Sequence, residues 1–435
     1  MKKSTVLAAS MLSCATAATA QSSVTLFGVV DAGVSYYSAK STFYNNTGAL
    51  VLPTATAPTG VTQSQTGLSN SGISNSRLGF RGTEDLGGGL SASFWLEAQL
   101  ANDTGLGGGS AGAFAFNRRS TVSLAGDFGE IRLGRDYTPT FWNDSVFSPF
   151  GTTGVGANVV STVGSNIAVA RGPGSALAAS DNYLRTNNSI GYFLPPTLGG
   201  FYGQLQYALH ENVDVSNVPG SPTTKGRFFG GRFGYASGPL DVALAYGAST
   251  AADTTGVNAA GGLTGVNLDE KIKTISLGAS YNFNVFKLIG ELSQVRDQKQ
   301  STTPVPVFGL LAARENDKYT GGLLGVTVPV GPGLIKASYS RVKFDNDLGS
   351  LASPFALRRD ASISKLAIGY EHNLSKRTAL YATVARIRVK DGQNNPAIMG
   401  ATTGGTAAYL STGAGTSGYA PSKAMGYDFG IKHAF

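Results

Sequence analysis

Residues Arg77–Leu100 have the sequence RLGFRGTEDLGGGLSASFWLEAQL, and their pattern indicates the fold of the whole chain. The stretch contains two runs in which apolar and polar residues alternate, and a glycine-rich turn at residues 86–90 joins them. A period of two is typical of β-strands, and a short glycine turn between two such runs predicts an antiparallel hairpin. The polar face of this hairpin carries arginines, a glutamate and an indole. A sheet with one apolar face and one charged face suits a wall between lipid and water.

The same pattern recurs along the whole chain, in about 16 alternating segments from residues 22–37 to residues 423–435. Very short turns separate the segments on one side, whereas loops of unequal length separate them on the other. This asymmetry predicts an all-β fold, a 16-stranded antiparallel transmembrane β-barrel with short periplasmic turns and long extracellular loops. An open sheet edge in hydrocarbon would leave backbone groups unpaired, so we expect the first strand to pair with the last.

Composition and the N-terminus indicate an exported membrane protein. Of 435 residues only 14% are charged, and no apolar run beyond the N-terminus approaches the ~20 residues of a membrane helix. Lys2 and Lys3, an apolar stretch and the small-residue site Ala18-Thr19-Ala20 predict a signal peptide over residues 1–20. The remaining residues, 21–435, would form the barrel. The single cysteine, Cys14, lies in the signal, so the mature chain has no disulfide or thiol chemistry.

Five segments, spread over nearly the whole chain in order, carry a family resemblance. They are SSVTLFGVVDAGV (residues 22–34), SRLGFRGTEDLGGGL (76–90), GEIRLGRDY (129–137), LRTNNSIGY (184–192) and FGIKHAF (429–435). With these segments the chain resembles the general porins of Gram-negative bacteria, in particular the branch typical of betaproteobacteria.

The resemblance implies both an architecture and a set of partners. It implies a homotrimer of 16-stranded barrels in the bacterial outer membrane, in contact with outer-membrane lipid and lipopolysaccharide. The third long loop, residues 138–183, would fold into the lumen and narrow it to an eyelet. The final aromatic residue, Phe435, would be the recognition signal for the barrel assembly machinery. The channel would pass small hydrophilic solutes and inorganic anions by passive diffusion.

The alternation also sorts charged residues into those that face the lumen. The basic candidates are Arg77, Arg81, Arg132, Arg185, Arg232, Lys287, Lys336, Lys365, Arg386, Arg388 and Lys432. The acidic candidates are Asp31, Glu97, Asp136, Asp241, Glu291, Glu371 and Asp428. Fixed charges in a narrow lumen concentrate ions of the opposite sign. The basic excess therefore favours anions.

The resemblance assigns some of these charges to the eyelet. The family's wall arginines match Arg77, Arg185 and the arginine that opens the fourth strand, with Arg81 as a secondary charge. For the fourth strand the motif favours Arg118, whereas the alternation favours Arg119, and the sequence does not decide between them. We expect Arg132, Glu97 and Asp136 to line the pore. Trp95 would either line the lumen as well or pack against the third loop.

The third loop is nearly free of acidic residues. Its only acids are Asp144 and Asp181, with Arg171 against them, and the stretch around Pro149, Phe150 and Gly151 is neutral. By resemblance the family usually places acidic residues there, facing the arginines. The sequence therefore predicts an anion-preferring pore.

Other functional classes are poorly supported. The chain has three histidines, and none is paired with a nucleophile in a pattern typical of acyl transfer, so we expect no enzyme activity. No cluster of residues has metal-ligand spacing, no motif calls for a cofactor, and the basic excess is too scattered for nucleic-acid binding. Two alternatives remain open. The barrel could serve as a scaffold for an adhesin or receptor that acts through its long loops, or it could be a substrate-specific channel.

Overall fold

A computed structural model describes residues 23–44, 60–169, 182–212, 224–254, 267–305, 309–348, 360–392, 395, 397–398 and 418–435. The predicted signal peptide at residues 1–20 lies outside these ranges, as do Arg171 and Asp181 of the third loop.

Strands dominate the described residues. The strands are β1 (Ser23–Tyr44), β2 (Gly60–Asn70), β3 (Arg77–Gly87), β4 (Leu90–Ala101), β5 (Leu106–Gly107), β6 (Arg119–Gly126), β7 (Gly129–Tyr137), β8 (Arg185–Phe193), β9 (Phe201–Ala208), β10 (Phe228–Ser237), β11 (Leu240–Thr254), β12 (Asn267–Asn282), β13 (Lys287–Val305), β14 (Gly309–Val330), β15 (Gly333–Leu348), β16 (Asp360–Asn373), β17 (Thr378–Lys390) and β18 (Gly418–Ala434). The helical elements are the short η1 (Ser110–Gly112), α2 (Pro139–Val146) and α3 (Val159–Val169). No helix in the described part of the chain is long and apolar enough to cross a membrane.

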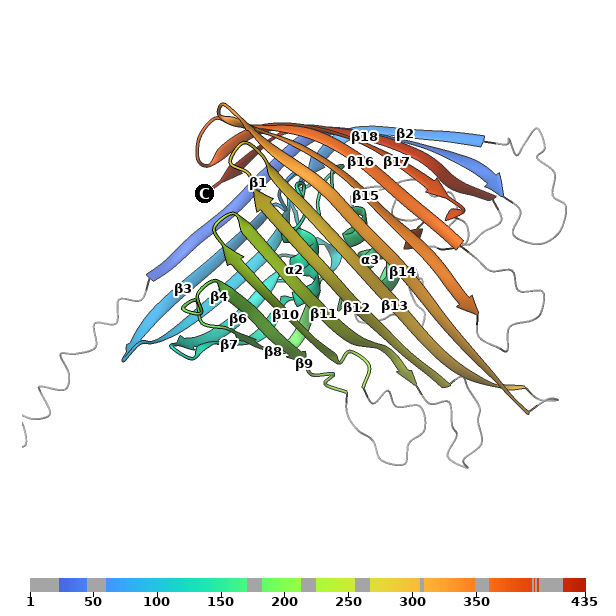
Figure 1. The fold of residues 1–435 in the computed structure, drawn as a ribbon, viewed down its shortest axis with the longest axis horizontal. Coiled ribbons are helices and arrows are strands. Elements are labelled where there is room, and N and C mark those ends of the chain that lie inside the picture. The colour runs from blue at the N-terminus through green and yellow to red at the C-terminus, as the bar shows by residue number, and fades with distance from the viewer. Residues whose placement is uncertain are drawn as a thin grey trace, which may run out of the picture.

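The strands form a closed antiparallel barrel, in which β2 and β5 are additions to a wall of sixteen strands (Figure 1). Closure occurs between β1 and β18, where the register runs from Val29 opposite Ala434 to Tyr44 opposite Gly418. The chain end completes this seam, because the backbone amides of Gly28 and Phe435 each donate to the other residue's carbonyl, at 3.0 and 3.1 Å. The predicted pairing of the first strand with the last is therefore confirmed.

The hairpin predicted at residues 77–100 is present as β3 and β4, with Arg77 opposite Gln99 and Gly82 opposite Phe94. Other turns at this end of the barrel are just as short. Gly238 and Gly331 occupy the first central position of two-residue turns with φ of 56° and 55°. A hairpin turn of type II′ requires glycine at that position, because a side chain disfavours a positive φ.

The two faces of the wall differ as a membrane barrel requires. Large apolar side chains are exposed on the outside, among them Leu26, Leu292, Leu324 and Phe429 at 54%, 66%, 60% and 61%. They would be unusual on a soluble surface but are suited to lipid contact. Polar side chains alternate with them and face inward.

Two expectations about the first strand and its loop need correction. β1 extends to Tyr44, beyond the predicted end at Tyr37, and β2 lies where a loop was expected between the first segment and the hairpin at residues 77–100. β2 pairs with the C-terminal part of β1, from Ala32 to Thr42, and β3 pairs with its N-terminal part, from Ser23 to Val29. The sequence pattern missed β2 because Gly60–Asn70 is almost entirely polar or small and therefore shows no alternation.

The assignment of Arg386 and Arg388 to the lumen is wrong. Both are exposed on the outer face, in phase with the exposed Val384, while Ile387 and Val389 point inward and are buried. The alternation predicts the opposite orientation because apolar side chains of β17, not charged ones, face the lumen here.

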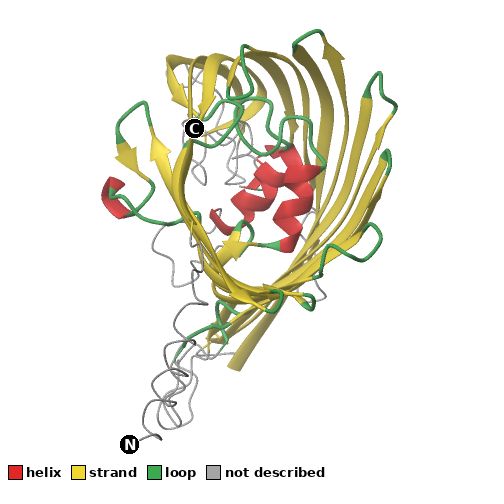
Figure 2. Ribbon diagram, turned by 90° about the vertical axis from the view of Figure 1, so that its left-hand side faces the viewer, coloured by secondary structure: helices red, strands yellow, loops and turns green. Residues whose placement is uncertain are grey.

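The apolar part of the lumen is where the third loop docks. Figure 2 shows its helices α2 and α3 inside the barrel. Val159, Val163 and Ile167 of α3 pack against a buried cluster on the inner wall that includes Ile363 and Ile387. Burial of this apolar surface holds the loop inward.

Candidate functional site

A cavity of about 830 Å³ lies between the docked loop and the wall formed by β3, β4, β6, β7 and β8. Its charged lining consists of Arg77, Arg81, Glu97, Arg118, Arg119 and Arg185. Aromatic side chains and the hydroxyl groups of the loop complete it, among them Tyr137, Phe141, Trp142, Ser145 and Thr153. The cavity thus gathers the arginines that the sequence assigned to the eyelet.

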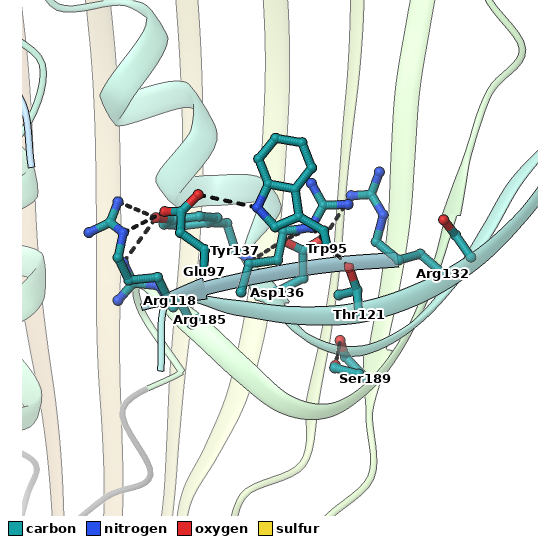
Figure 3. Close-up of polar contacts among 12 residues, drawn as sticks. Trp95, Glu97, Arg118, Thr121, Arg132, Asp136, Tyr137, Arg185 and Ser189 are labelled. Carbon is teal, nitrogen blue, oxygen red and sulfur yellow. Dashed lines mark hydrogen bonds and ion pairs between the residues drawn. The ribbon is translucent and has the colours of Figure 1, made fainter. Parts of the chain in front are cut away.

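One half of the arginine cluster is organised by Glu97 and Tyr137 (Figure 3). The Glu97 carboxylate accepts a hydrogen bond from Arg118 Nε at 2.5 Å and lies 3.9 Å from Arg77 Nε. The Tyr137 hydroxyl accepts from the Nη2 atoms of Arg118 and Arg185, at 2.7 and 3.0 Å. The Arg185 guanidinium also lies 4.5 Å from the centre of the Tyr137 ring. One carboxylate and one phenol therefore position three cations.

The other half is organised by Trp95. The guanidinium carbons of Arg81 and Arg119 lie 5.3 and 4.7 Å from its ring centre, and Phe27 packs beside it at 4.8 Å. Trp95 Nε1 donates to Glu97 at 3.2 Å. Cation–π contacts hold an arginine in place without neutralising its charge. Of the two positions that the sequence left open for Trp95, the structure places it in the lumen wall.

The arginines differ in how fully their charge is offset. Arg118 is bound to Glu97, and Arg119 lies 3.8 Å from Asp136. Among the described residues, Arg81 and Arg185 have no carboxylate within ion-pair distance. These two are therefore the strongest sources of uncompensated positive charge.

Arg132 and Asp136, two of the residues expected to line the pore, form a closed network beside the cavity. Arg132 donates two hydrogen bonds of 2.9 Å to Glu130 and one of 2.7 Å to Asp136. Its guanidinium also lies 3.9 Å from the centre of the Phe193 ring. Neither Arg132 nor Asp136 lines the cavity. With two carboxylates on one arginine, this group offers little free charge.

The choice between Arg118 and Arg119 is resolved in favour of both. Arg119 opens β6 opposite Glu97, and Arg118 precedes the strand, outside the regular ladder. Because Arg118 lies outside the strand, the alternation of faces does not fix its direction. Its side chain points inward like that of Arg119, and both arginines line the cavity.

The loop wall of the cavity is neutral. Phe150 and Gly151 line it, whereas Pro149 lies behind, where it packs against Gly325 of the barrel wall. Asp144, the loop's one described acid, is buried and points away from the arginines. Its carboxylate accepts a hydrogen bond from the Tyr183 hydroxyl, and it lies beside Glu291 of β13. Burial raises the pKa of Asp144.

Several inward charges hold the loops rather than face the pore. Asp31 accepts from the backbone amides of Ile73 and Ser74 at 2.9 and 2.7 Å, and from the Tyr381 hydroxyl at 2.6 Å. Asp428 accepts from the amide of Val155 in the third loop at 2.8 Å. Lys365 donates to the carbonyl of Ala157 at 2.9 Å. The alternation pattern alone does not distinguish inward charges that hold a loop from inward charges that line the cavity.

Sequence reasoning missed four aromatic residues of the site, Phe27, Tyr137, Phe141 and Trp142. Tyr137 ends β7, and its ring stacks on Phe141 at 5.5 Å and lies 5.4 Å from Trp142. Trp142 lies on the cavity-facing side of α2. Asn143, on another side of α2, packs on the wall, and Thr138 caps the helix at its N-terminus. The segment GEIRLGRDY that marks the family contains Tyr137, but the pattern did not indicate its role.

Comparisons with known proteins agree with the fold. A family model described as Gram-negative porin matches residues 4–392. Outer membrane porin protein 32 of Delftia acidovorans is 38% identical over 392 residues, which cover 90% of this chain and 91% of the relative. The solved structure of an anion-selective porin from Comamonas acidovorans has a TM-score of 0.63 and 34% sequence identity, and the match covers 95% of this chain and all (100%) of that one. A loop-deletion variant of OmpT from Vibrio cholerae, 12% identical with a TM-score of 0.54, shares the fold alone. The chain belongs to the Gram-negative porins.

Proposed function

We propose that this outer-membrane porin, a channel for passive diffusion, prefers anions. The observation that carries the proposal is the charged lining of the cavity, which has five arginines and one glutamate, opposite a neutral loop. In a narrow lumen with low-dielectric walls, such an excess attracts anions and repels cations. The description of the Comamonas structure as anion-selective supports the same reading.

Ion replacement in a planar bilayer tests the preference. When bulky gluconate replaces chloride, we expect the single-channel conductance to fall steeply, because the mobile anion carries most of the current. When bulky tetraethylammonium replaces potassium, the conductance should change little. The opposite pattern would show that cations carry the current and would reject the proposal.

We further propose that the channel is a general one for small hydrophilic solutes, with no catalytic activity of its own. The cavity is wide, and its lining mixes guanidinium groups, hydroxyls and rings from several strands. Liposome swelling with neutral sugars of graded size should show a smooth cutoff. Saturation by one sugar would indicate a specific channel, and negligible uptake of all of them would indicate a scaffold.

We also propose that lipopolysaccharide is a partner, on the evidence of two rows of basic residues on the outer face. In the first row Lys273 is opposite Arg296, and Arg296 is opposite Lys318, on three adjacent strands. In the second row Arg388 is opposite Lys423, and Lys423 is opposite Lys40. Both rows lie on the half of the barrel away from the short turns.

Like charges directly opposite one another destabilise a sheet unless an anion is shared between them. Within the described residues, none of these six side chains has a carboxylate at ion-pair distance. The phosphate groups of lipopolysaccharide would neutralise both rows, as basic clusters on membrane proteins do with anionic headgroups.

The remaining assignments follow from the family. We propose that residues 1–20 are removed as a signal peptide, that Phe435 is read by the barrel assembly machinery, and that the mature chain forms a homotrimer. The exposed ring of Phe435 at the barrel seam is compatible with recognition before closure. Light scattering of the protein in detergent, with the detergent mass subtracted, should give three times the chain mass. A monomer mass would contradict the trimer.

A further inference from the structure

The eyelet cavity contains one arginine whose hydrogen-bonding capacity is largely unused. Arg185 donates from Nη2 to the Tyr137 hydroxyl at 3.0 Å. Its Nε is buried and, among the described residues, has no hydrogen-bond acceptor. Nε is closed off from the cavity, but Nη1 makes no hydrogen bond within the described residues, and the side chain lines the cavity. An anion such as a carboxylate can therefore accept a charge-assisted hydrogen bond from this guanidinium.

An aromatic surface lies beside this arginine. The Arg185 guanidinium and the Trp142 ring are centred 4.5 and 5.4 Å from the ring of Tyr137. The ring of Phe141 also stacks on Tyr137, nearly parallel at 11°. Trp142 is only partly buried, and it lines the same cavity as Arg185. A flat ligand held by Arg185 would therefore have the indole beside it in the same cavity.

The cavity is also large enough for such a ligand. Small-molecule sites typically have volumes of about 300–1,000 Å³, and this one has about 830 Å³. A small inorganic anion would use the arginines but not the rings. An aliphatic carboxylate would satisfy Arg185 but gain little from the indole face.

We propose that the eyelet is a transient binding site for planar aromatic carboxylates, with the carboxylate on Arg185 and the ring against Trp142. This inference rests on the proposed anion preference and names the class of solute that the pore retains longest. Stacking between rings adds about 0.5–1.5 kcal/mol to simple burial, and this corresponds to roughly two- to tenfold in affinity.

Block of the chloride current in a planar bilayer tests the proposal. The probes are benzoate and cyclohexanecarboxylate, which carry the same charge and have similar size but differ in the aromatic ring. We expect benzoate to halve the single-channel chloride current at a concentration about fivefold lower than cyclohexanecarboxylate does. Equal block by both probes would overturn the proposal.

Three variants assign the effect to the residues. Trp142→Leu should remove the advantage of benzoate, and Trp142→Phe should retain most of it, because a ring remains. Phe201→Leu, on the exposed outer face, is the matched control and should behave as the unaltered protein does. Arg185→Gln should weaken block by both probes alike. An advantage of benzoate that persists in Trp142→Leu would contradict the assignment.

The test also separates this inference from the anion preference. If the pore prefers chloride but both probes block equally, only the aromatic site fails. If the pore prefers potassium and neither probe blocks it, the anion preference fails and the aromatic site fails with it.

Discussion

At the scale of single residues, the structure separates arginines that carry free charge from arginines that are structurally engaged. Arg81 lies over the rings of Phe27 and Trp95, and Arg185 lies on Tyr137, without a described carboxylate partner for either. Arg132 is hydrogen-bonded to two carboxylates. The contribution of each arginine to anion selectivity should therefore depend on whether a carboxylate offsets its charge as much as on its position in the lumen.

This distinction can be tested by comparing matched substitutions. Arg81→Gln and Arg185→Gln should each lower the chloride-to-potassium permeability ratio by up to about thirtyfold, because a unit charge ~4 Å away attracts chloride and repels potassium by about 1 kcal/mol each in water. Arg132→Gln removes the same formal charge but should change the ratio much less. Permeability ratios of the three variants provide the check. An equal loss in all three would show that the partners do not matter.

At the scale of elements, the third loop is held by apolar packing on one side and by polar anchors on the other. α3 packs on the inner wall at Ile363 and Ile387, and the amide of Val155 donates to Asp428. In α2, Asn143 donates to the carbonyls of Ala243 and Ser276 at 3.1 and 3.2 Å. The loop that forms one side of the cavity is therefore fixed to the wall along much of its described length.

We expect the buried Asp144 to make this docking dependent on pH. Burial raises the pKa of Asp144, so the docked loop binds the proton more tightly than an undocked loop would. The resulting stabilisation is complete below the ordinary pKa of an aspartate and is lost as the pH rises through the raised value. We expect protease cleavage within the loop to increase towards alkaline pH.

Asp144→Asn is the matched variant for this prediction, because asparagine keeps the shape but cannot ionise. It should reduce the alkaline increase in cleavage. Asp127→Asn, in the short turn between β6 and β7, is the control and should leave the pH profile unchanged. If Asp144→Asn shows the same profile as the unaltered protein, Asp144 does not control the docking.

The sequence predicted the barrel well because each wall strand faces lipid on one side, which imposes a period of two. The prediction from the sequence fails where wall side chains contact another element of the chain instead of water or lipid. Arg386 and Arg388 were assigned to the lumen because α3 makes the inner side of β17 apolar. The roles of Tyr137 and Trp142 depend on how the third loop folds back onto the wall. The contact between these two rings cannot be predicted from the local sequence pattern.

At the scale of the whole molecule, the outer surface has an apolar band and, beyond it, the two basic rows. The outward positions of β13 change from Leu288 and Leu292 to Arg296 as the strand leaves the short-turn end. The neighbouring strands β12 and β14 change in the same way, to Lys273 and Lys318. The barrel thus has a lipid level and an anionic-headgroup level on the same strands.

The basic rows predict a measurable affinity for lipopolysaccharide. The double variant Lys273→Gln/Arg296→Gln should retain less lipopolysaccharide after purification in mild detergent, measured by mass spectrometry of the extracted lipid. Lys287→Gln, near the short turns, is the control and should retain the normal amount. Unchanged retention in the double variant would argue against the first row as the binding site.

If the arginines of the cavity select anions, they set the sign of the reversal potential of the purified protein in a planar bilayer. Under a KCl gradient we expect a potential whose sign corresponds to chloride permeating faster than potassium. The potential should move towards zero in the double variant Arg81→Gln/Arg185→Gln. A potential of the opposite sign in the unaltered protein would show that the pore prefers cations.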